Sequence, residues 1–315
     1  MSKVEFIAEC CQNHNGDKEI LKKMIHTASE NGADYVKIQA IRSKDLSKRL
    51  RFEDGEVDSS GKIKVIKRPY KNELERLKKL DLSLEDEFWF VEECQKAGVK
   101  SMTTLFTRNA CDEISKMGYD AIKIASYDCA SYPLLNDVKK ITNNIFVSTG
   151  ATFDDEIIKA SEVLAGSNYQ FLHCVTIYPT PLEKLNLNRI NYLKKFTNYV
   201  GYSDHSKPSE TGLIASKIAI AMGSTCIERH YTVLKPDESR DGPVSINPQM
   251  LSELSHFSNL ENHEQWNHIN AIFPGWKITL GEESRDLSDE ELLNRDYYRG
   301  RFVNKEKNKE YFNWD

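Results

Sequence analysis

Gly201-Tyr202-Ser203-Asp204-His205 is the segment from which the fold can be worked out: a short apolar run gives way to polar residues and ends at a histidine. Ile227-Glu228-Arg229-His230-Tyr231 repeats this order. In α/β enzymes the chemistry usually lies where the strands end. Either histidine alone is most simply an ordinary loop or core residue. Together, two imidazoles with nearby carboxylates predict a site for one divalent metal ion.

Strand-like and helix-like segments alternate on both sides of these two segments. The expected strands are 4–9, 33–39, 99–104, 121–126, 145–149, 169–174, 199–201 and 225–230. Helical segments are expected from residue 18 to 31, before Gly98, and near 108–117, 133–142, 154–165, 187–196, 209–222 and 247–268. This alternation predicts the α/β class and a closed (β/α)8 TIM barrel. A doubly wound open sheet is the alternative, because strand number cannot show closure.

Two regions interrupt the pattern. Residues 42–71 are basic and irregular, which is typical of a disordered connection or of a functional lid. After Gly281 the sequence becomes charged and aromatic. We therefore expect residues 1–281 to form the catalytic barrel and residues 282–315 to form a short charged C-terminal tail with no core of its own.

Composition limits the kinds of partner. The 315 residues include 43 basic and 48 acidic side chains, a net charge of -5, which favours neither a nucleic acid nor a membrane surface as a partner. No apolar run reaches the roughly 18 residues that a membrane span needs. The N-terminus enters a strand at once, leaving no room for a signal peptide. Seven scattered cysteines predict a reducing cytoplasm, and the adjacent Cys10 and Cys11 lack a second pair for a structural zinc.

Two strands carry a lysine within an apolar run, Val36-Lys37-Ile38 and Ile122-Lys123-Ile124. Alternate strand residues face the barrel interior, so both lysines are expected to point inward. A buried ammonium is costly unless an anion meets it. An internal glutamate, Glu9 or Glu228, is one partner. Two such lysines favour a shared anionic ligand that carries a carboxylate or a phosphate.

Hydroxyls lie at successive strand ends, at Ser126, Ser148-Thr149-Gly150 and Ser203. Hydroxyls beside glycine-exposed amides suit a phosphate. Each is a weak signal alone, but together they are expected to surround one mouth of the barrel.

These segments resemble, in order, the motif series of the sialic acid synthase family, which includes legionaminic and pseudaminic acid synthases and a spore-coat polysaccharide branch. The resemblance extends to about residue 250 and rests on Ile7-Ala8-Glu9, Asn13-His14-Asn15-Gly16, residues 32–39, Lys123-Ile124-Ala125-Ser126, Ser148-Thr149-Gly150, residues 172–181, Gly201-Tyr202-Ser203-Asp204-His205 and residues 228–232.

The resemblance implies a barrel enzyme that condenses phosphoenolpyruvate with the open-chain aldehyde of an N-acylated hexosamine of the mannosamine type. The products would be phosphate and a nonulosonic, sialic-acid-like 2-keto-3-deoxy acid. It also implies a divalent metal as Lewis acid. Mn²⁺ suits a site whose remaining ligands are oxygens, with Mg²⁺ or Co²⁺ as alternatives.

The resemblance also implies roles for individual residues. His205 and His230 would hold the metal. Glu9, Tyr178 and Asp241 would orient the sugar or handle protons, and a carboxylate beside carbon 2 of phosphoenolpyruvate would balance positive charge that develops there. Lys37 and Lys123 would bind phosphoenolpyruvate. The further substrate-binding positions are Thr104, Phe106, Ser126, Asp128, Ser148, Thr149, Gly150, Thr176 and Ser203.

The chain departs from the family pattern in several places. Leu105 stands where the family usually has proline, Thr176 where some members have asparagine, and Asp128 where others have glutamate. A small C-terminal antifreeze-like domain, which lends an arginine to the partner subunit, is expected to be missing. A homodimer is expected, and a separate protein or Arg295, Arg299 or Arg301 of the tail would supply the cation. A charged surface tail without a catalytic role is the simpler interpretation.

Two rival functions remain open. One is a phosphoenolpyruvate-using aldolase of the same fold that acts on a shorter phosphorylated sugar, which would need an arginine or lysine cluster not evident outside residues 42–71. The other is an inactive barrel that binds a sugar or a partner protein as a regulatory subunit. Retention of both histidines and both inward lysines argues against the second, because burying them is costly without a ligand.

Overall fold

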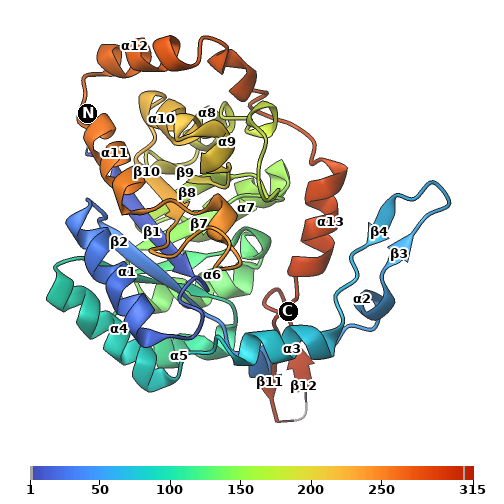
Figure 1. Cartoon of the computed structure of the whole chain (residues 1–315). Coiled ribbons are helices and arrows are strands. Elements are labelled where there is room, and N and C mark those ends of the chain that lie inside the picture. The colour runs from blue at the N-terminus through green and yellow to red at the C-terminus, as the bar shows by residue number, and fades with distance from the viewer. Residues whose placement is uncertain (1–2, 308) are drawn as a thin grey trace.

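The computed structural model describes residues 3–307 and 309–315. In these residues, eight parallel strands close into a barrel in the order β1-β10-β9-β8-β7-β6-β5-β2 (Figure 1). The barrel strands are β1 (Glu5–Cys11), β2 (Tyr35–Ala40), β5 (Lys100–Leu105), β6 (Ala121–Ile124), β7 (Ile145–Ser148), β8 (Tyr169–Cys174), β9 (Val200–Asp204) and β10 (Cys226–His230). Closure confirms the predicted (β/α)8 fold and excludes the open sheet.

Helices connect the strands and cover the barrel. They are α1 (Lys18–Glu30), α4 (Leu84–Ala97), α5 (Cys111–Ile114), α6 (Tyr132–Ile141), α7 (Asp154–Leu164), α8 (Arg189–Leu193), α9 (Pro208–Thr211), α10 (Ile214–Ala221), α11 (Pro248–Ser258) and α12 (Asn262–Ile272). The single helix expected over 209–222 is wrong. The chain breaks at Gly212, whose φ of 59° is outside the right-handed helical region. The segment 247–268 likewise forms two helices.

The barrel interior has two layers of opposite character. An apolar layer comes from the early part of the strands and contains Ile7, Tyr35, Met102, Ala121, Phe146, Leu172 and Cys226. Two residues further along each strand lies a buried polar layer, which we define as Glu9, Lys37, Thr104, Lys123, Ser148, Cys174, Ser203 and Glu228. The residues that flank Lys37 and Lys123 belong instead to the main core. The prediction that both lysines point inward is therefore confirmed.

A buried ion pair joins the ends of β9 and β10. Nη1 of Arg229 lies 2.5 Å from Oδ2 of Asp204, and both side chains are almost fully buried. Oδ1 of Asp204 also accepts a hydrogen bond from the Ser206 amide at 2.8 Å. Because His205 and His230 directly follow the paired residues, this ion pair fixes the two strand ends that carry the histidines.

The connection after β2 is ordered, so its interpretation as a disordered segment is wrong. It contains α2 (Arg51–Asp54), the hairpin of β3 (Glu56–Val57) and β4 (Ile63–Val65), and α3 (Tyr70–Lys78). Figure 1 shows α13 (Asp289–Tyr298) running beside the barrel, between it and this hairpin. The C-terminal tail continues into the small hairpin of β11 (Asn304–Glu306) and β12 (Lys309–Tyr311).

The C-terminal tail is partly buried, so its interpretation as a charged surface segment is wrong. Phe302 packs in a cluster with Ile41, Leu46 and Leu77, and Tyr297 packs in another with Phe52 and Val65. The tail thus shares two small apolar clusters with the connection after β2. The sequence could not show this, because each partner is more than 200 positions away.

Within the described residues, no helix is both long and apolar enough to cross a lipid bilayer. The seven cysteines are all buried free thiols. The expectation that they do not form a disulfide framework is confirmed.

Gly201→Ala is predicted to destabilise the barrel. A Cβ at this position would lie 2.4 Å from Cδ2 of Leu172 and 2.7 Å from the carbonyl oxygen of Cys226. Overpacking of this kind typically costs about 1–3 kcal/mol. At Gly275 the nearest atom to a new Cβ is 3.9 Å away, so Gly275→Ala is the matched control. Urea denaturation should show a loss only for Gly201→Ala, and equal midpoints would contradict this account.

Candidate active site

Four charged side chains of the polar layer form a charge cluster, which we define as Glu9, Lys37, Lys123 and Glu228. Lys37 forms an ion pair with Glu9, its neighbour in the β1–β2 register. Glu228 bridges the two lysines, with Oε2 3.5 Å from Nζ of Lys37 and Oε1 3.2 Å from Nζ of Lys123. The four side chains are between 2% and 5% exposed. Internal glutamates therefore satisfy both lysines, so burial alone does not require an anionic ligand.

The charge cluster shifts the protonation equilibria of its members. Burial lowers the pKa of Lys37 to about 7, although the neighbouring Glu228 favours the charged ammonium. Burial opposes ionisation of Glu228, but Lys123 and Lys37 hold the pKa of this carboxyl below its usual range. Glu228 is therefore a carboxylate, while Lys37 is close to its titration point at neutral pH. A second anion beside Lys37 would raise the pKa of this lysine.

Three of the predicted hydroxyls contact the charge cluster directly. Nζ of Lys37 donates to Thr104 at 2.9 Å, and Nζ of Lys123 donates to Ser148 at 2.7 Å. Ser203 donates to Oε1 of Glu228 at 2.6 Å. The expected convergence of hydroxyls from different strands is therefore found at one depth in the barrel.

The remaining small polar residues lie around the same mouth but differ in their contacts. Ser126 accepts from the Gly150 amide at 3.2 Å, whereas Thr149 donates to the carbonyl oxygen of Leu172 at 3.2 Å. The hydroxyl of Thr176 is buried and has no hydrogen-bond partner among the described residues. A Cβ at Gly150 would lie 2.7 Å from Cγ2 of Thr176 and 3.0 Å from Oγ of Ser126, so these three residues are near one another. The hydroxyl of Thr149, in contrast, is bound to the backbone.

The two predicted metal ligands lie side by side. The ring centroids of His205 and His230 are 5.4 Å apart, and the ring of Tyr178 lies 4.0 Å from that of His205. Nδ1 of His205 lies 3.3 Å from the carbonyl oxygen of Val175, whereas Nδ1 of His230 is buried without a hydrogen-bond partner in the part of the chain described.

Burial favours the neutral form of both imidazoles. Burial lowers the pKa of His205 to about 3, with His230 adding to the shift. Burial also lowers the pKa of His230, although Asp241 opposes this. Neutral imidazole is the form that binds metals.

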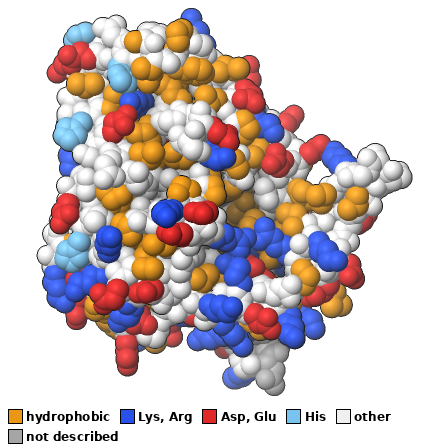
Figure 2. All heavy atoms as spheres, viewed as in Figure 1, with side chains coloured by type: hydrophobic (Ala, Val, Ile, Leu, Met, Phe, Trp, Pro, Cys, Tyr) orange, Lys and Arg blue, Asp and Glu red, His pale blue; other side chains and the backbone are white. Residues whose placement is uncertain are grey.

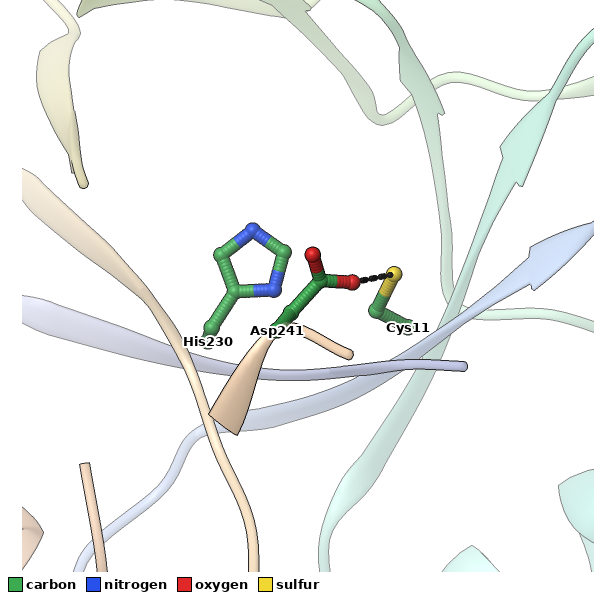
Figure 3. A group of neighbouring side chains, drawn as sticks. All are labelled: Cys11, His230 and Asp241. Atoms are coloured by element: carbon green, nitrogen blue, oxygen red, sulfur yellow. Dashed lines mark hydrogen bonds between the residues drawn. The ribbon is translucent and has the colours of Figure 1, made fainter. Parts of the chain in front are cut away.

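Two further potential metal ligands, a thiol and a carboxylate, lie beside His230. Figure 3 shows Cys11 and Asp241 next to its ring, and one donor atom from each of the three lies within 4.8 Å of the others. Sγ of Cys11 is 3.2 Å from Oδ2 of Asp241. Burial raises the pKa of the Cys11 thiol, and Asp241 adds to this. The buried Nδ1 of His230, which has no hydrogen-bond partner among the described residues, lies beside a carboxylate and a thiol. Such a set of donor atoms can bind a divalent metal ion.

The sequence interpretation missed Cys11 and treated it only as half of a cysteine pair. Its neighbours His230 and Asp241 lie more than 200 positions later in the sequence, at the end of β10 and in the segment after it. The available signal was the position of Cys11 at the end of the first strand, which is where functional side chains of a barrel lie.

Phe106 and Asp128 lie in a separate part of the site. They line a small cavity together with the tail residues Tyr298, Arg301 and Asn313. Nδ2 of Asn313 donates to Oδ1 of Asp128 at 2.9 Å and to the Phe106 carbonyl oxygen at 2.8 Å. The C-terminal tail therefore forms one wall of this cavity and already binds the predicted Asp128.

The three tail arginines are paired with carboxylates. Arg295 donates to Glu156 at 2.8 Å, and Arg299 lies 3.4 Å from the same residue. Arg301 pairs with Glu73, and of the three it is the one that lines the cavity beside Asp128. Figure 2 shows Lys and Arg side chains gathered beside a hollow on this face of the molecule.

A closed parallel barrel with buried charged and imidazole side chains at the carboxyl ends of its strands has the architecture of TIM-barrel enzymes. The chain belongs to the NeuB family, whose model matches residues 24–266. The resemblance found in the sequence is confirmed.

Several relatives of the chain are named as synthases of sialic acid or of related sugar acids. The N,N'-diacetyllegionaminic acid synthase of Campylobacter jejuni is 32% identical over 261 residues, which are 81% of this chain and 75% of that protein. The N-acetylneuraminate-9-phosphate synthase of Mus musculus is 30% identical, covering 79% and 67%. A crystal structure of the N-acetylneuraminic acid synthetase of Leptospira borgpetersenii matches with a TM-score of 0.70 and 26% identity, covering 94% and 91%.

Glu228→Gln is predicted to destabilise the protein by about 3–5 kcal/mol, because it leaves Lys123 and Lys37 without their shared carboxylate. The folded-state pKa of Glu228 lies below the ordinary 4.5, so its contribution is fully present above pH 4.5 and declines as the pH falls further. Chemical denaturation at several pH values should show the difference between variant and parent shrinking below pH 4.5.

Glu210→Gln is the control, because Glu210 forms an exposed ion pair with Lys207. Its effect should stay within about 1 kcal/mol at every pH. Equal losses in the two variants would show that the buried charge cluster has no special role in stability.

Proposed function

We propose that this protein condenses phosphoenolpyruvate with the open-chain aldehyde of an N-acylated hexosamine of the mannosamine type, giving a nonulosonic acid and phosphate. The proposal rests on one observation: two groups of side chains, one cationic and one of imidazoles, lie at the same end of the barrel. Lysines with hydroxyl partners lie in the polar layer, and two buried imidazoles lie at the ends of β9 and β10. The names of the relatives support the same class of reaction.

Phosphoenolpyruvate would bind at the charge cluster. Lys37 and Lys123 would contact its phosphate and carboxylate, while Ser148 and Thr104 donate from positions that already contact the two ammonium groups. The apolar layer beneath excludes water from this end of the site. Bound anion would compete with Glu9 and Glu228 for the lysines, so these carboxylates limit how tightly the anion binds.

His205 and His230 would hold a divalent metal, which when bound polarises the sugar aldehyde as a Lewis acid. The buried Nδ1 of His230 and the adjacent oxygen of Asp241 support this assignment. Mn²⁺ is the ion that we expect, with Mg²⁺ and Co²⁺ as alternatives. Tyr178, half exposed above the ring of His205, would orient the sugar over the imidazoles.

Two carboxylates would handle charge and protons. The attack of carbon 3 of phosphoenolpyruvate on the aldehyde leaves positive charge at carbon 2, which a neighbouring carboxylate stabilises and which water then quenches. Glu9 is held in place by Lys37 and by the Cys11 amide, which donates to it at 2.6 Å. Asp241 lies beside His230. We propose that Glu9 stabilises the charge at carbon 2 of phosphoenolpyruvate and that Asp241 acts beside the sugar aldehyde.

The acceptor would extend toward the cavity beneath the C-terminal tail. This cavity combines the aromatic ring of Phe106 with the polar groups of Asp128, Arg301 and Asn313. An N-acyl group offers a methyl and an amide to such a surface. The tail would thereby contribute to acceptor binding within the same chain.

Activity is tested by measuring phosphate release from phosphoenolpyruvate with Mn²⁺ and a panel of N-acetylated mannosamine derivatives, with product masses determined for each. We expect release with at least one nonphosphorylated acceptor. Lys123→Met should lower turnover by about 10²–10³-fold, whereas Lys140→Met, at an exposed lysine of α6, should not. Release only with phosphorylated sugars would favour the related aldolase. Sugar binding without any release would favour a regulatory barrel.

The affinity for phosphoenolpyruvate should fall as the pH rises through 7. Burial gives Lys37 a pKa of about 7, and its protonated form is the one that attracts the anion. Lys37→Arg keeps its charge at any accessible pH and should flatten this dependence. Calorimetric titration on both sides of pH 7 measures the effect. An affinity that stays constant in the parent protein would remove Lys37 from the anion site.

A further inference from the structure

We propose that Cys11 is a ligand of the metal in this site, together with His230 and Asp241, whose donor atoms lie beside its sulfur. The inference rests on the proposed function in one respect, the presence of a divalent ion at the two imidazoles. It adds a thiolate to a site that the sequence predicted from imidazoles and oxygens alone. The evidence is the grouping of donor atoms from Cys11, His230 and Asp241 within 4.8 Å of one another.

The backbone at the end of β1 places the thiol in the site. The β1–β2 register shifts between Glu9 and Cys11, and Cys11 has a φ of 46°. Such left-handed conformations are unfavourable for residues other than glycine. The Cys11 amide donates to Oε1 of Glu9 at 2.6 Å, which anchors the turn. The result is a side chain only 6% exposed whose sulfur faces Asp241.

A second, independent observation supports a cation at this position. His230 is 8% exposed, and its Nδ1 is buried with no hydrogen-bond partner among the described residues. The Cys11 thiol donates its proton in a hydrogen bond to Oδ2 of Asp241 across 3.2 Å, next to the ring of His230. A divalent ion would replace that proton, which would leave to solvent as the thiol becomes a thiolate.

A thiolate changes which metals the site prefers. Sulfur is a soft ligand that favours Zn²⁺ and Co²⁺ over Mg²⁺ and Mn²⁺ relative to an all-oxygen and imidazole site. The buried position of Cys11 also keeps competing water from the sulfur. The preference for Co²⁺ and Zn²⁺ over Mn²⁺ in binding affinity is therefore expected to be larger than at a site of imidazoles and oxygens alone.

Cys174 is the rival sulfur ligand. Its Sγ lies 3.9 Å from Nδ1 of His205 and 3.5 Å from the hydroxyl of Ser126. The same Nδ1 lies 3.3 Å from the carbonyl oxygen of Val175, and Cys174 does not belong to the group of donors around His230. Variants of the two cysteines therefore discriminate between the candidates.

Optical spectroscopy of the Co²⁺-loaded full-length protein tests the proposal without depending on turnover. A cobalt–thiolate bond gives a charge-transfer band in the near ultraviolet. The metal-stripped protein, kept reduced, is titrated with Co²⁺, and the band is expected in the parent and in Cys174→Ala. It should be absent from Cys11→Gly and Cys11→Ser. Glycine suits the left-handed backbone at this position, so Cys11→Gly tests the sulfur without adding strain.

Competition with a chromophoric chelator supplies the second measurement. Cys11→Gly should weaken Zn²⁺ binding by at least about 10-fold while changing Mn²⁺ binding much less, since sulfur is what favours the softer ion. Circular dichroism confirms that each variant is folded. A band that persists in Cys11→Gly, or that is lost in Cys174→Ala, would overturn the proposal.

The experiments distinguish failure of the proposed reaction from failure of the proposed Cys11 ligand. A thiolate band without phosphate release from any sugar in the panel leaves Cys11 as a ligand and removes the synthase reaction. Phosphate release supported by Co²⁺ without a thiolate band keeps the reaction and removes Cys11 from the metal.

Discussion

The ion-paired charge cluster inside the barrel is the constraint on which the rest of the site depends. Two ammonium groups, from Lys37 and Lys123, lie above an apolar layer where an isolated charge would be very costly. Glu9 and Glu228 neutralise them. The protein therefore folds with its cations already desolvated and positioned. In the proposed reaction, an incoming anion would have only to exchange with these carboxylates, because the cost of burying the lysines has been met during folding.

A second buried pair, Asp204 with Arg229, connects this cluster to the two histidines. On β9 and β10, the residue before each member of the pair faces the polar layer, and the residue after it is one of the two histidines. Successive side chains of a strand point to opposite faces, so three consecutive residues have three different contacts. Glu228 binds the lysines, Arg229 fixes the strand end, and His230 presents its ring. Changes to Arg229 would therefore disturb the site without any direct contact with substrate.

The sequence was informative where the signal was local. Strand alternation predicted the barrel, and period-two patterning predicted the inward direction of Lys37 and Lys123, because both depend on neighbouring residues. Two features needed contacts between distant parts of the chain and could not be predicted in this way. Burial of the C-terminal tail requires partners such as Leu77 for Phe302. The thiol of Cys11 becomes a candidate ligand only when barrel closure brings Asp241 beside it.

The central claim is that one barrel mouth binds an anion through buried lysines and a divalent ion through buried imidazoles. A crystal structure of the protein with phosphoenolpyruvate and Co²⁺ tests it most directly. The account predicts phosphate and carboxylate oxygens in contact with Lys37 and Lys123, and the ion on His205 and His230. An anion bound outside the polar layer, or an ion that contacts neither histidine, would contradict it.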